Sequence, residues 1–299
     1  MRQKRFVGFI KNANSANDGI SYNNILNLRQ MKRFIYGSFT SGLWMRICRS
    51  SSFSITAITL GALLAFSSCD LWETKVCRSY VTTYVRLNSF SLEYESGSTR
   101  IDAIIGNRSA ALSFDCHFLS KGDDLRRFED YCRKRGDVSY EQRISVHKGG
   151  SAFTGPTYLT EDFISVAVTS DTDYDDSHPA GTDLNDICRF MAFSPYRFIA
   201  SGYRDRFDYG TSGLSAEFRE FAKTRYGSLP DEALGYHPID KPLSDVTLED
   251  LKLLGLDYPD CLFGLLLEKK PSSPGEHKMT VKIVSESGKS YSASTIVTF

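Results

Sequence analysis

The sequence predicts a mainly β fold, an antiparallel β-sandwich with a few short helical insertions. Three observations lead to this prediction. Many short segments alternate β-branched or aromatic residues with polar ones, which is typical of half-buried strands. Only three short segments carry apolar residues at helical spacing. The chain also closes on two alternating runs joined by a short turn, so its last element is predicted to be a β-hairpin.

The composition supports a folded domain and excludes one class of partner. Hydrophobic residues make up 41% of the 299 positions, which is enough for a buried core. Residues 1–68 hold nine of the 36 Lys and Arg and one of the 36 Asp and Glu. Residues 69–299 therefore keep 27 bases and 35 acids, a net charge of −8. Nucleic-acid binding needs clustered Lys and Arg, so no nucleic-acid partner is expected.

The first element along the chain is an apolar run, FSITAITLGALLAF at residues 53–66, preceded by Arg46 and Arg49. Its length falls short of the roughly 20 residues that a membrane-spanning helix needs. A buried core helix would suit this length too, but the run is apolar on every side and has no amphipathic face. We therefore predict a signal peptide at residues 45–68. Met45 is its expected start, which makes residues 1–44 a doubtful extension, disordered or not translated.

Phe66-Ser67-Ser68-Cys69 resembles a bacterial lipobox, although Phe66 stands where Leu is usual. The resemblance implies that Cys69 carries a diacylglycerol thioether and becomes the first residue of the mature protein. Acyl chains contribute about 0.8 kcal/mol for each buried CH₂ group, so two or more of them give stable anchoring. The chain is then expected to be an outer-membrane-anchored lipoprotein of the cell envelope, on its periplasmic or its cell-surface face. Residues 69–75 are expected to form the lipidated tether.

Residues 76–299 are predicted to form a single β-rich domain. The predicted strands cover residues 76–94, 101–105, 111–119, 143–146, 163–169, 188–200 and 261–268. The last of these, CLFGLLLE, is nearly all apolar, which indicates a strand buried on both faces. An immunoglobulin-like sandwich is one form that such a pattern can take.

The closing hairpin joins MTVKIV to YSASTIVTF, with its turn expected at residues 286–289. Side chains alternate between the two faces of a strand. This period predicts one shared face for Tyr291, Ala293, Thr295, Val297 and Phe299. The hairpin is similar to the last two strands of sandwiches in bacterial surface lipoproteins.

Helical insertions are predicted at about 120–136 and 212–255. Residues 123–135 open with acids, close with bases and are followed by Gly136, which suits the helix dipole and a C-terminal cap. Residues 214–226 have a similar apolar spacing and end at Gly227. Residues 247–254 begin with a Thr-x-x-Asp capping box, so a third short helix is expected there.

The cysteines after Cys69 do not have the spacing of a zinc site. They are Cys77, Cys116, Cys132, Cys188 and Cys261. An exported protein meets conditions in which disulfides persist, so one or two can form. The sequence leaves their pairing open. The other cysteines are expected to act as small buried hydrophobic side chains.

An acidic loop, TSDTDYDDSHPAGTDLND at residues 169–186, is the one candidate metal site. Its candidate ligands are Asp171, Asp173, Asp175, Asp176 and Asp183, with Asn185 and Asp186 beside them. The first three alternate like the leading ligands of a Ca²⁺-binding EF-hand loop. The match then fails, because Asp176 replaces the glycine and Thr182 replaces the bidentate glutamate. Two hypotheses follow, a solvated acidic loop and a Ca²⁺ site of another type, with Ca²⁺ as the one cofactor considered.

Sequence motifs of catalysis are absent. The chain has no GxSxG, HExxH, GxGxxG or P-loop pattern, so no catalytic residue is assigned. His178, in the acidic loop, is the histidine nearest to a candidate catalytic group.

An aromatic stretch, RFMAFSPYRFIASGYRDRFDYG at residues 189–210, holds the candidate contact residues. Tyr203 and Tyr209 are flanked by Arg and Gly, so they are expected to be exposed and to contact a glycan or a protein partner. Phe190, Phe193 and Phe198 of the same stretch are expected in the core.

Four features together resemble uncharacterised lipoproteins of the Bacteroidetes: the lipobox, the loop ending HPAGTDLND, the segment SPYRFIASGY and the final hairpin. This resemblance implies a lipoprotein and brings no catalytic residues. The main hypothesis is a non-enzymatic, lipid-anchored envelope lipoprotein that binds a glycan, a protein partner or a surface assembly. The alternative is a Ca²⁺-dependent hydrolase or a Ca²⁺-stabilised binding module that uses the Asp171–Asp186 loop.

Overall fold

The computed structural model of the chain describes residues 72–113, 123–147, 156–210, 213–230, 234–255 and 260–299. The chain divides into two units, 1–67 and 68–299, and every described residue belongs to the second. The predictions for residues 1–68, for lipidation of Cys69 and for Cys116 lie outside the described residues. The predicted tether differs from the structure in part, because strand β1 (Trp72–Cys77) already begins within residues 69–75.

The largest sheet has six strands in the order β5-β2-β3-β9-β7-β8. The strands are β5 (Thr157–Leu159), β2 (Thr83–Tyr94), β3 (Arg100–Ser113), β9 (Cys261–Leu267), β7 (Cys188–Ser194) and β8 (His237–Pro242). Neighbouring strands are antiparallel apart from the parallel pair β2–β5.

A second sheet has three antiparallel strands in the order β11-β10-β6. They are β11 (Ser290–Thr298), β10 (Glu276–Ser285) and β6 (Phe163–Ser170). A short two-stranded ladder pairs β1 with β4 (Gln142–His147). The predicted hairpin is therefore confirmed: in β11, Tyr291 and Val297 are buried, while their neighbours Ser292 and Ile296 are exposed.

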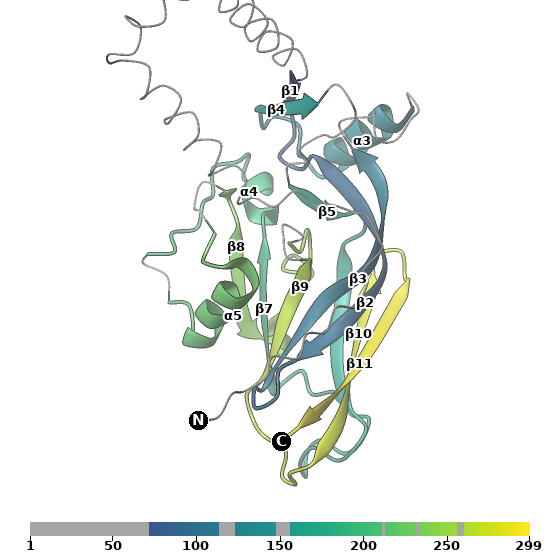
Figure 1. Ribbon diagram of the computed structural model, residues 1–299, viewed down its shortest axis with the longest axis vertical. Helices are drawn as coiled ribbons and strands as arrows, with labels where there is room; N and C mark the ends of the chain where they lie inside the picture. The colour runs from purple at the N-terminus through teal and green to yellow at the C-terminus, as the bar shows by residue number, and fades with distance from the viewer. Residues whose placement is uncertain (1–71, 114–122, 148–155, 211–212, 231–233, 256–259) are drawn as a thin grey trace, which may run out of the picture. The chain divides into compact units, whose positions relative to one another are not determined.

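The two larger sheets pack face to face around one hydrophobic core. Ile101 and Leu265 enter this core from the six-stranded sheet, and Val168 and Val281 enter it from the three-stranded sheet. Strand β11 also packs against β2, where the Tyr291 hydroxyl donates to the Leu87 carbonyl oxygen at 3.1 Å. The predicted mainly β, sandwich-like fold is thus confirmed (Figure 1). Its sheets of six and three strands differ from the four and three of an immunoglobulin constant domain.

Helices cover the other face of the six-stranded sheet (Figure 1). They are α3 (Asp123–Lys134), α4 (Tyr196–Ala200) and α5 (Ala216–Tyr226), and they share a second core cluster with the sheet. Because side chains alternate along a strand, β7 sends Phe190 into the first core and Phe193 into the second. Burial on both faces explains why β7 and β9 are nearly continuous apolar runs, as predicted for β9.

Helices α3 and α5 lie where the sequence predicted them. The Ser215 side chain accepts a hydrogen bond from the Phe218 N–H, and Gly227 ends α5 with a left-handed φ of 75°. Two other predictions differ from the structure. The strand predicted at 188–200 ends at Ser194, because Pro195 precedes helix α4. Among its described residues, the region predicted as helical, 212–255, contains strand β8 and a 3-10 helix at Leu243–Asp245 besides α5.

The third predicted helix, at residues 247–254, is a series of turns. Its capping box does form, since the Thr247 N–H donates to Asp250 Oδ2 at 2.9 Å. The segment then turns inward, with Leu253 at a φ of 47°, and Leu251 and Leu254 join the core. Burial of these leucines outweighs the local helical signal. In the described ranges, no helix has the length and apolar character needed to span a membrane.

Candidate functional site

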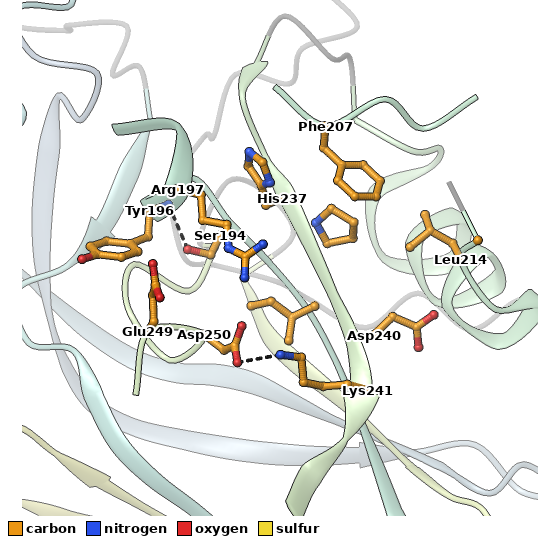
Figure 2. Close-up of a pocket in the computed structure, with 13 residues that line it drawn as sticks. Ser194, Tyr196, Arg197, Phe207, Leu214, His237, Asp240, Lys241, Glu249 and Asp250 are labelled. Carbon is orange, nitrogen blue, oxygen red and sulfur yellow. Dashed lines mark hydrogen bonds and ion pairs between the residues drawn. The ribbon is translucent and has the colours of Figure 1, made fainter. Parts of the chain in front are cut away.

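A cavity of about 280 Å³ lies beside β8, the edge strand of the six-stranded sheet (Figure 2). Its walls come from β8, the turn from β7 into α4, Phe207, residues 213–214 and the turn at 249–250. Its lining residues are Ser194, Tyr196, Arg197, Phe207, Gly213, Leu214, His237, Pro238, Ile239, Asp240, Lys241, Glu249 and Asp250. The volume is just below the roughly 300–1,000 Å³ of typical small-ligand pockets.

Strand pairing assembles this cavity from distant parts of the chain. In the β7–β8 ladder, Ser194 lies opposite His237 and Phe193 opposite Pro238. Proline cannot donate to a ladder, so a strand with prolines at 238 and 242 suits only a sheet edge. The edge position of β8 leaves five successive residues, 237–241, free to line the cavity.

Two of the charged groups in the cavity are already paired. Lys241 Nζ lies 2.8 Å from Asp250 Oδ2, and the Thr247 hydroxyl and N–H donate to the same oxygen. Burial opposes ionisation of Asp250, but these hydrogen bonds outweigh it and hold the pKa of Asp250 below its usual value. Asp250 is therefore an anion at neutral pH that fixes the position of the Lys241 ammonium.

Asp240 is paired in the same way on the opposite side of the cavity. Its Oδ1 accepts from Arg189 Nη1 at 2.9 Å, and its Oδ2 accepts from the Ser215 N–H at 2.8 Å. By contrast, the side chains of Arg197 and Glu249 have no hydrogen-bond or ion-pair partner within the described part of the chain, and both residues are exposed. Figure 2 shows both side chains at the same side of the cavity as Asp250. These two are the charges that a ligand can reach.

The remaining wall is apolar and aromatic. Phe207, Leu214 and Ile239 contribute side chains to it. Phe207 packs edge-on against His237, with ring centroids 5.9 Å apart. His237 Nε2 lies 2.9 Å from the Asp205 carbonyl oxygen, so this nitrogen donates its proton there. The imidazole is thus held by its own chain.

The geometry of the cavity suits binding more than nucleophilic chemistry. Its serine hydroxyl, Ser194 Oγ, donates to the Lys252 carbonyl oxygen at 2.6 Å and accepts from the Tyr196 N–H. A nucleophilic serine would instead be hydrogen-bonded to a general base such as a histidine. Among the residues that line the cavity, no hydroxyl bonds to His237.

The acidic loop does not gather its carboxylates. Each of four predicted ligands accepts a hydrogen bond from the chain itself: Asp171 from the Lys278 N–H, Asp173 from the Ala180 N–H, Asp175 from the Ser177 N–H and Asp183 from the Asn185 N–H. The fifth, Asp176, is exposed. Across the described ranges, no group of three or more acidic, histidine or cysteine side chains is placed to hold a metal ion.

His178 joins two parts of this loop, because its ring nitrogens contact Asp175 and Asp186. It is 8% exposed, its Nδ1 lies 2.7 Å from Asp175 Oδ1 and its Nε2 lies 2.9 Å from Asp186 Oδ1. The hydrogen bond from Asp175 raises the pKa of His178 against the opposing effect of burial, and Asp186 adds to the rise. The residue nearest to a catalytic histidine by sequence is therefore engaged on both nitrogens.

The acidic loop covers the edge of β6. The Leu184 N–H donates to the Val168 carbonyl oxygen at 2.9 Å, and the Val168 N–H donates to the Asn185 side chain. Asn185 Nδ2 in turn reaches the Val166 carbonyl oxygen. Unpaired strand edges invite pairing with other chains, and covering them is one way to prevent it. The loop therefore protects a sheet edge.

The predicted contact residues Tyr203 and Tyr209 are not both exposed. Tyr209 is 6% exposed and its hydroxyl donates to the Tyr236 carbonyl oxygen at 2.6 Å, so the expectation of exposure is wrong for this residue. Tyr203 is half-buried and donates to Asp137 Oδ1 at 2.8 Å. Their neighbour Phe207 reaches the cavity instead.

Four of the 13 residues that line the cavity lie in a stretch that the sequence singles out. The aromatic stretch at 189–210 supplies Ser194, Tyr196, Arg197 and Phe207, although none of these was named as a contact residue. The others, Gly213, Leu214 and seven residues between 237 and 250, carry no motif that points to a binding site. An edge-strand pattern with two prolines was the one available signal for β8.

No family model matches the chain, and no curated protein or solved structure has significant similarity to it.

Proposed function

We propose that the chain is a non-enzymatic, lipid-anchored lipoprotein of the cell envelope, held at the outer membrane by Cys69. The observation that carries the proposal is the lipobox-like segment Phe66-Ser67-Ser68-Cys69, which ends an uncharged apolar run. Every described element begins at or after Trp72, three residues beyond Cys69. Cleavage before Cys69 would therefore remove none of the described domain.

The spacing also limits how far the domain can stand from the bilayer. An extended chain spans at most about 3.3–3.6 Å per residue, so three residues reach roughly 10 Å. An anchor at Cys69 thus holds β1, and the domain that follows it, next to the membrane surface. A lipid anchor of this kind needs no spanning segment.

The cavity beside β8 is the proposed binding site, and a glycan is the proposed ligand. Sugars present hydroxyl groups around the ring edge and C–H groups on the ring faces. Arg197 and Glu249 offer a donor and an acceptor without a partner in the described ranges, and Phe207 and Ile239 offer apolar surface. Because the exposed Arg197 can form a charge-assisted hydrogen bond with a carboxylate, and Lys241 lines the same cavity, an acidic sugar is favoured over a neutral one.

Calorimetric titration with two matched oligosaccharides tests the ligand. Tetrasaccharides of glucuronic acid and of glucose differ in the carboxylate at C6 of each ring. The purified protein is expected to bind the acidic one more tightly, and Arg197→Ala is expected to remove that preference. Arg126→Ala, an exposed arginine on α3, is the matched control and should leave binding unchanged. Absence of heat with both sugars, or an equal loss in the control, would contradict this assignment.

A further inference from the structure

Two half-buried tyrosines and four exposed arginines gather where β1 and β4 meet the segment that follows α4. The rings of Tyr140 and Tyr203 lie against each other with centroids 5.1 Å apart, and both side chains are partly open to solvent. The arginines around them are all exposed. This group is called the Tyr–Arg surface, and it consists of Arg78, Tyr140, Arg143, Tyr203, Arg204 and Arg206.

Contacts between distant segments hold the Tyr–Arg surface together. The Tyr140 N–H donates to the Arg78 carbonyl oxygen at 3.1 Å. The fully buried ring of Phe198 lies 5.9 Å from the Tyr140 ring and 5.6 Å from the Tyr203 ring, between centroids. The guanidinium carbon of Arg206 lies 5.6 Å from the centre of the same Phe198 ring. The tyrosines and arginines are therefore presented by a packed part of the domain.

The Tyr–Arg surface lies at the end of the domain where the chain enters from Cys69. Arg78 directly follows β1, and Arg143 lies opposite Val76 in the β1–β4 ladder, so these two side chains share a face. Figure 1 shows β1, β4 and α4 at one end of the sandwich and the C-terminus at the other. Since β1 begins three residues after Cys69, a lipid anchor there brings this end nearest to the bilayer.

The charge of the Tyr–Arg surface is opposite in sign to that of the domain. Residues 69–299 carry a net charge of −8. The surface has four arginines, and the exposed acids within residues 138–143 and 203–206 are Glu141 and Asp205. Arginine matches the geometry of a phosphate group, and tyrosine is enriched at membrane–water interfaces. Val138, 46% exposed and close to Tyr140 in sequence, adds an apolar side chain. Net positive charge, tyrosine and a small apolar side chain together suit an anionic bilayer surface.

We propose that the Tyr–Arg surface binds the headgroups of anionic phospholipids in the membrane that carries the anchor. The inference rests on the proposed function, because the anchor at Cys69 is what holds this end of the domain near a bilayer. The arginines form charge-assisted hydrogen bonds with lipid phosphates, and Tyr140 and Tyr203 lie at the level of the headgroups. A basic surface added to an acyl anchor fixes the orientation of the domain on the membrane, which a short tether alone does not.

Hydroxyl-radical footprinting of the full chain in lipid vesicles tests the proposal. The protein is expressed in a bacterial host, purified in detergent and reconstituted into vesicles of phosphatidylcholine, with or without phosphatidylglycerol. Oxidation of Tyr140 and Tyr203 is expected to fall in the anionic vesicles and to recover at high salt, which screens the attraction. Tyr94, half-buried at the far end of β2, is the internal control and should be oxidised equally in both kinds of vesicle.

Matched double variants separate this surface from a general effect of charge. Protection is taken as the ratio of tyrosine oxidation in neutral and anionic vesicles. Arg204→Ala combined with Arg206→Ala should abolish the protection of both tyrosines. Lys278→Ala combined with Lys282→Ala removes the same charge from exposed positions on β10 and should leave the protection unchanged. Equal oxidation of the wild type in both kinds of vesicle, or an equal loss of protection in the lysine variant, would overturn the proposal.

Mass spectrometry of the N-terminus in the same preparation separates this inference from the anchor. An acylated Cys69 without protection of the tyrosines would overturn the lipid-binding surface and leave the anchor intact. A protein that keeps the residues before Cys69 and still shows salt-sensitive protection would contradict the anchor and support the surface.

Discussion

Gly235 is a position where adding one methyl group should be costly. Its backbone has a left-handed φ of 65°, and a Cβ there would lie 2.8 Å from Cδ2 of Phe198 and closer still to Cγ and Cδ1. The Phe198 ring is fully buried, and the rings of Tyr80, Tyr140 and Tyr203 surround it with centroids 5.6, 5.9 and 5.6 Å away. The ring has no free space into which it could move.

Gly227 provides a control that separates the two costs of Gly235→Ala. Its φ of 75° is similar, but nothing lies within 4 Å of its Cβ position. Both substitutions place an L-residue in the left-handed region, which costs roughly 1–2 kcal/mol. Stiffening of the unfolded chain offsets about 0.4–1 kcal/mol of this cost. Only Gly235→Ala adds the overlap with Phe198, which is expected to cost about 1–3 kcal/mol more.

Urea denaturation followed by circular dichroism measures both variants. Gly227→Ala should lower the free energy of unfolding by about 1 kcal/mol or less, and Gly235→Ala by about 2–4 kcal/mol. Combining Gly235→Ala with Phe198→Leu should cost less than the sum of the two single changes, because the smaller side chain relieves the overlap. Equal losses in Gly227→Ala and Gly235→Ala would refute the packing argument.

Three further predictions concern charged groups with hydrogen-bonded partners. Arg225→Ala removes the guanidinium that lies 2.6 Å from the Asp102 carboxylate and should lower the free energy of unfolding by about 3 kcal/mol. A larger loss is not expected, because Arg100 still faces the same carboxylate. Urea denaturation midpoints measure the change. The hydrogen bond from Asp175 raises the pKa of His178, so the stabilisation by this pair is present below about pH 6.5 and is lost as pH rises through the folded pKa. The same hydrogen bond lowers the pKa of Asp175, so the stabilisation by the pair is also lost in strong acid. Melting temperature should therefore fall at both ends of the pH range, and His178→Asn should remove both of these falls. Burial raises the pKa of Asp137, so its contribution to stability is greatest in acid and is lost as pH rises. Asp137→Asn should make melting temperature less dependent on pH in this range. It should also lower the free energy of unfolding by about 1–3 kcal/mol, because the Val81 N–H loses its acceptor oxygen. A wild-type slope that survives Asp137→Asn would contradict the last of these.

The elements that the sequence could predict are those whose local pattern and tertiary contacts agree. In β11, the period of two matches the burial of Tyr291 and Val297. In α5, the serine cap and Gly227 set the same limits that packing of Phe218 and Phe221 requires. The apolar run of β9 reflects cores on both faces of its sheet.

Other elements depend on contacts that a local pattern does not encode. Residues 247–254 have a capping box, but Leu253 packs in the second core cluster and Leu254 in the first. A regular helix could not place these two neighbours in separate clusters, and the segment forms turns instead. Strand β8 has two prolines and little alternation, and it becomes a strand only because β7 offers an edge. Tertiary burial outweighs propensity in the first case and creates a strand in the second.

The candidate sites show a similar division. A run of aspartates predicts carboxylates near one another, but it does not say whether they meet a cation or the N–H groups of their own loop. Asp171 and Asp173 accept backbone hydrogen bonds, so they need no cation to satisfy them. The cavity beside β8 could not be predicted whole, because its walls come together only through long-range contacts: the pairing of β7 with β8 and the hydrogen bond from Ser194 Oγ to the Lys252 carbonyl oxygen.

The central claim is that Cys69 anchors this domain to a membrane. Metabolic labelling with radioactive palmitate, followed by mass spectrometry of the N-terminus, tests it on the full chain in a bacterial host. Lipidation at Cys69 should give a labelled protein that begins at an acylated Cys69, and an unlabelled, uncleaved Cys69→Ala variant, with Cys188→Ala labelled as in the wild type. A Cys69→Ala variant that is labelled and cleaved like the wild type, or a membrane-bound wild type that keeps residues before Cys69, would contradict the claim.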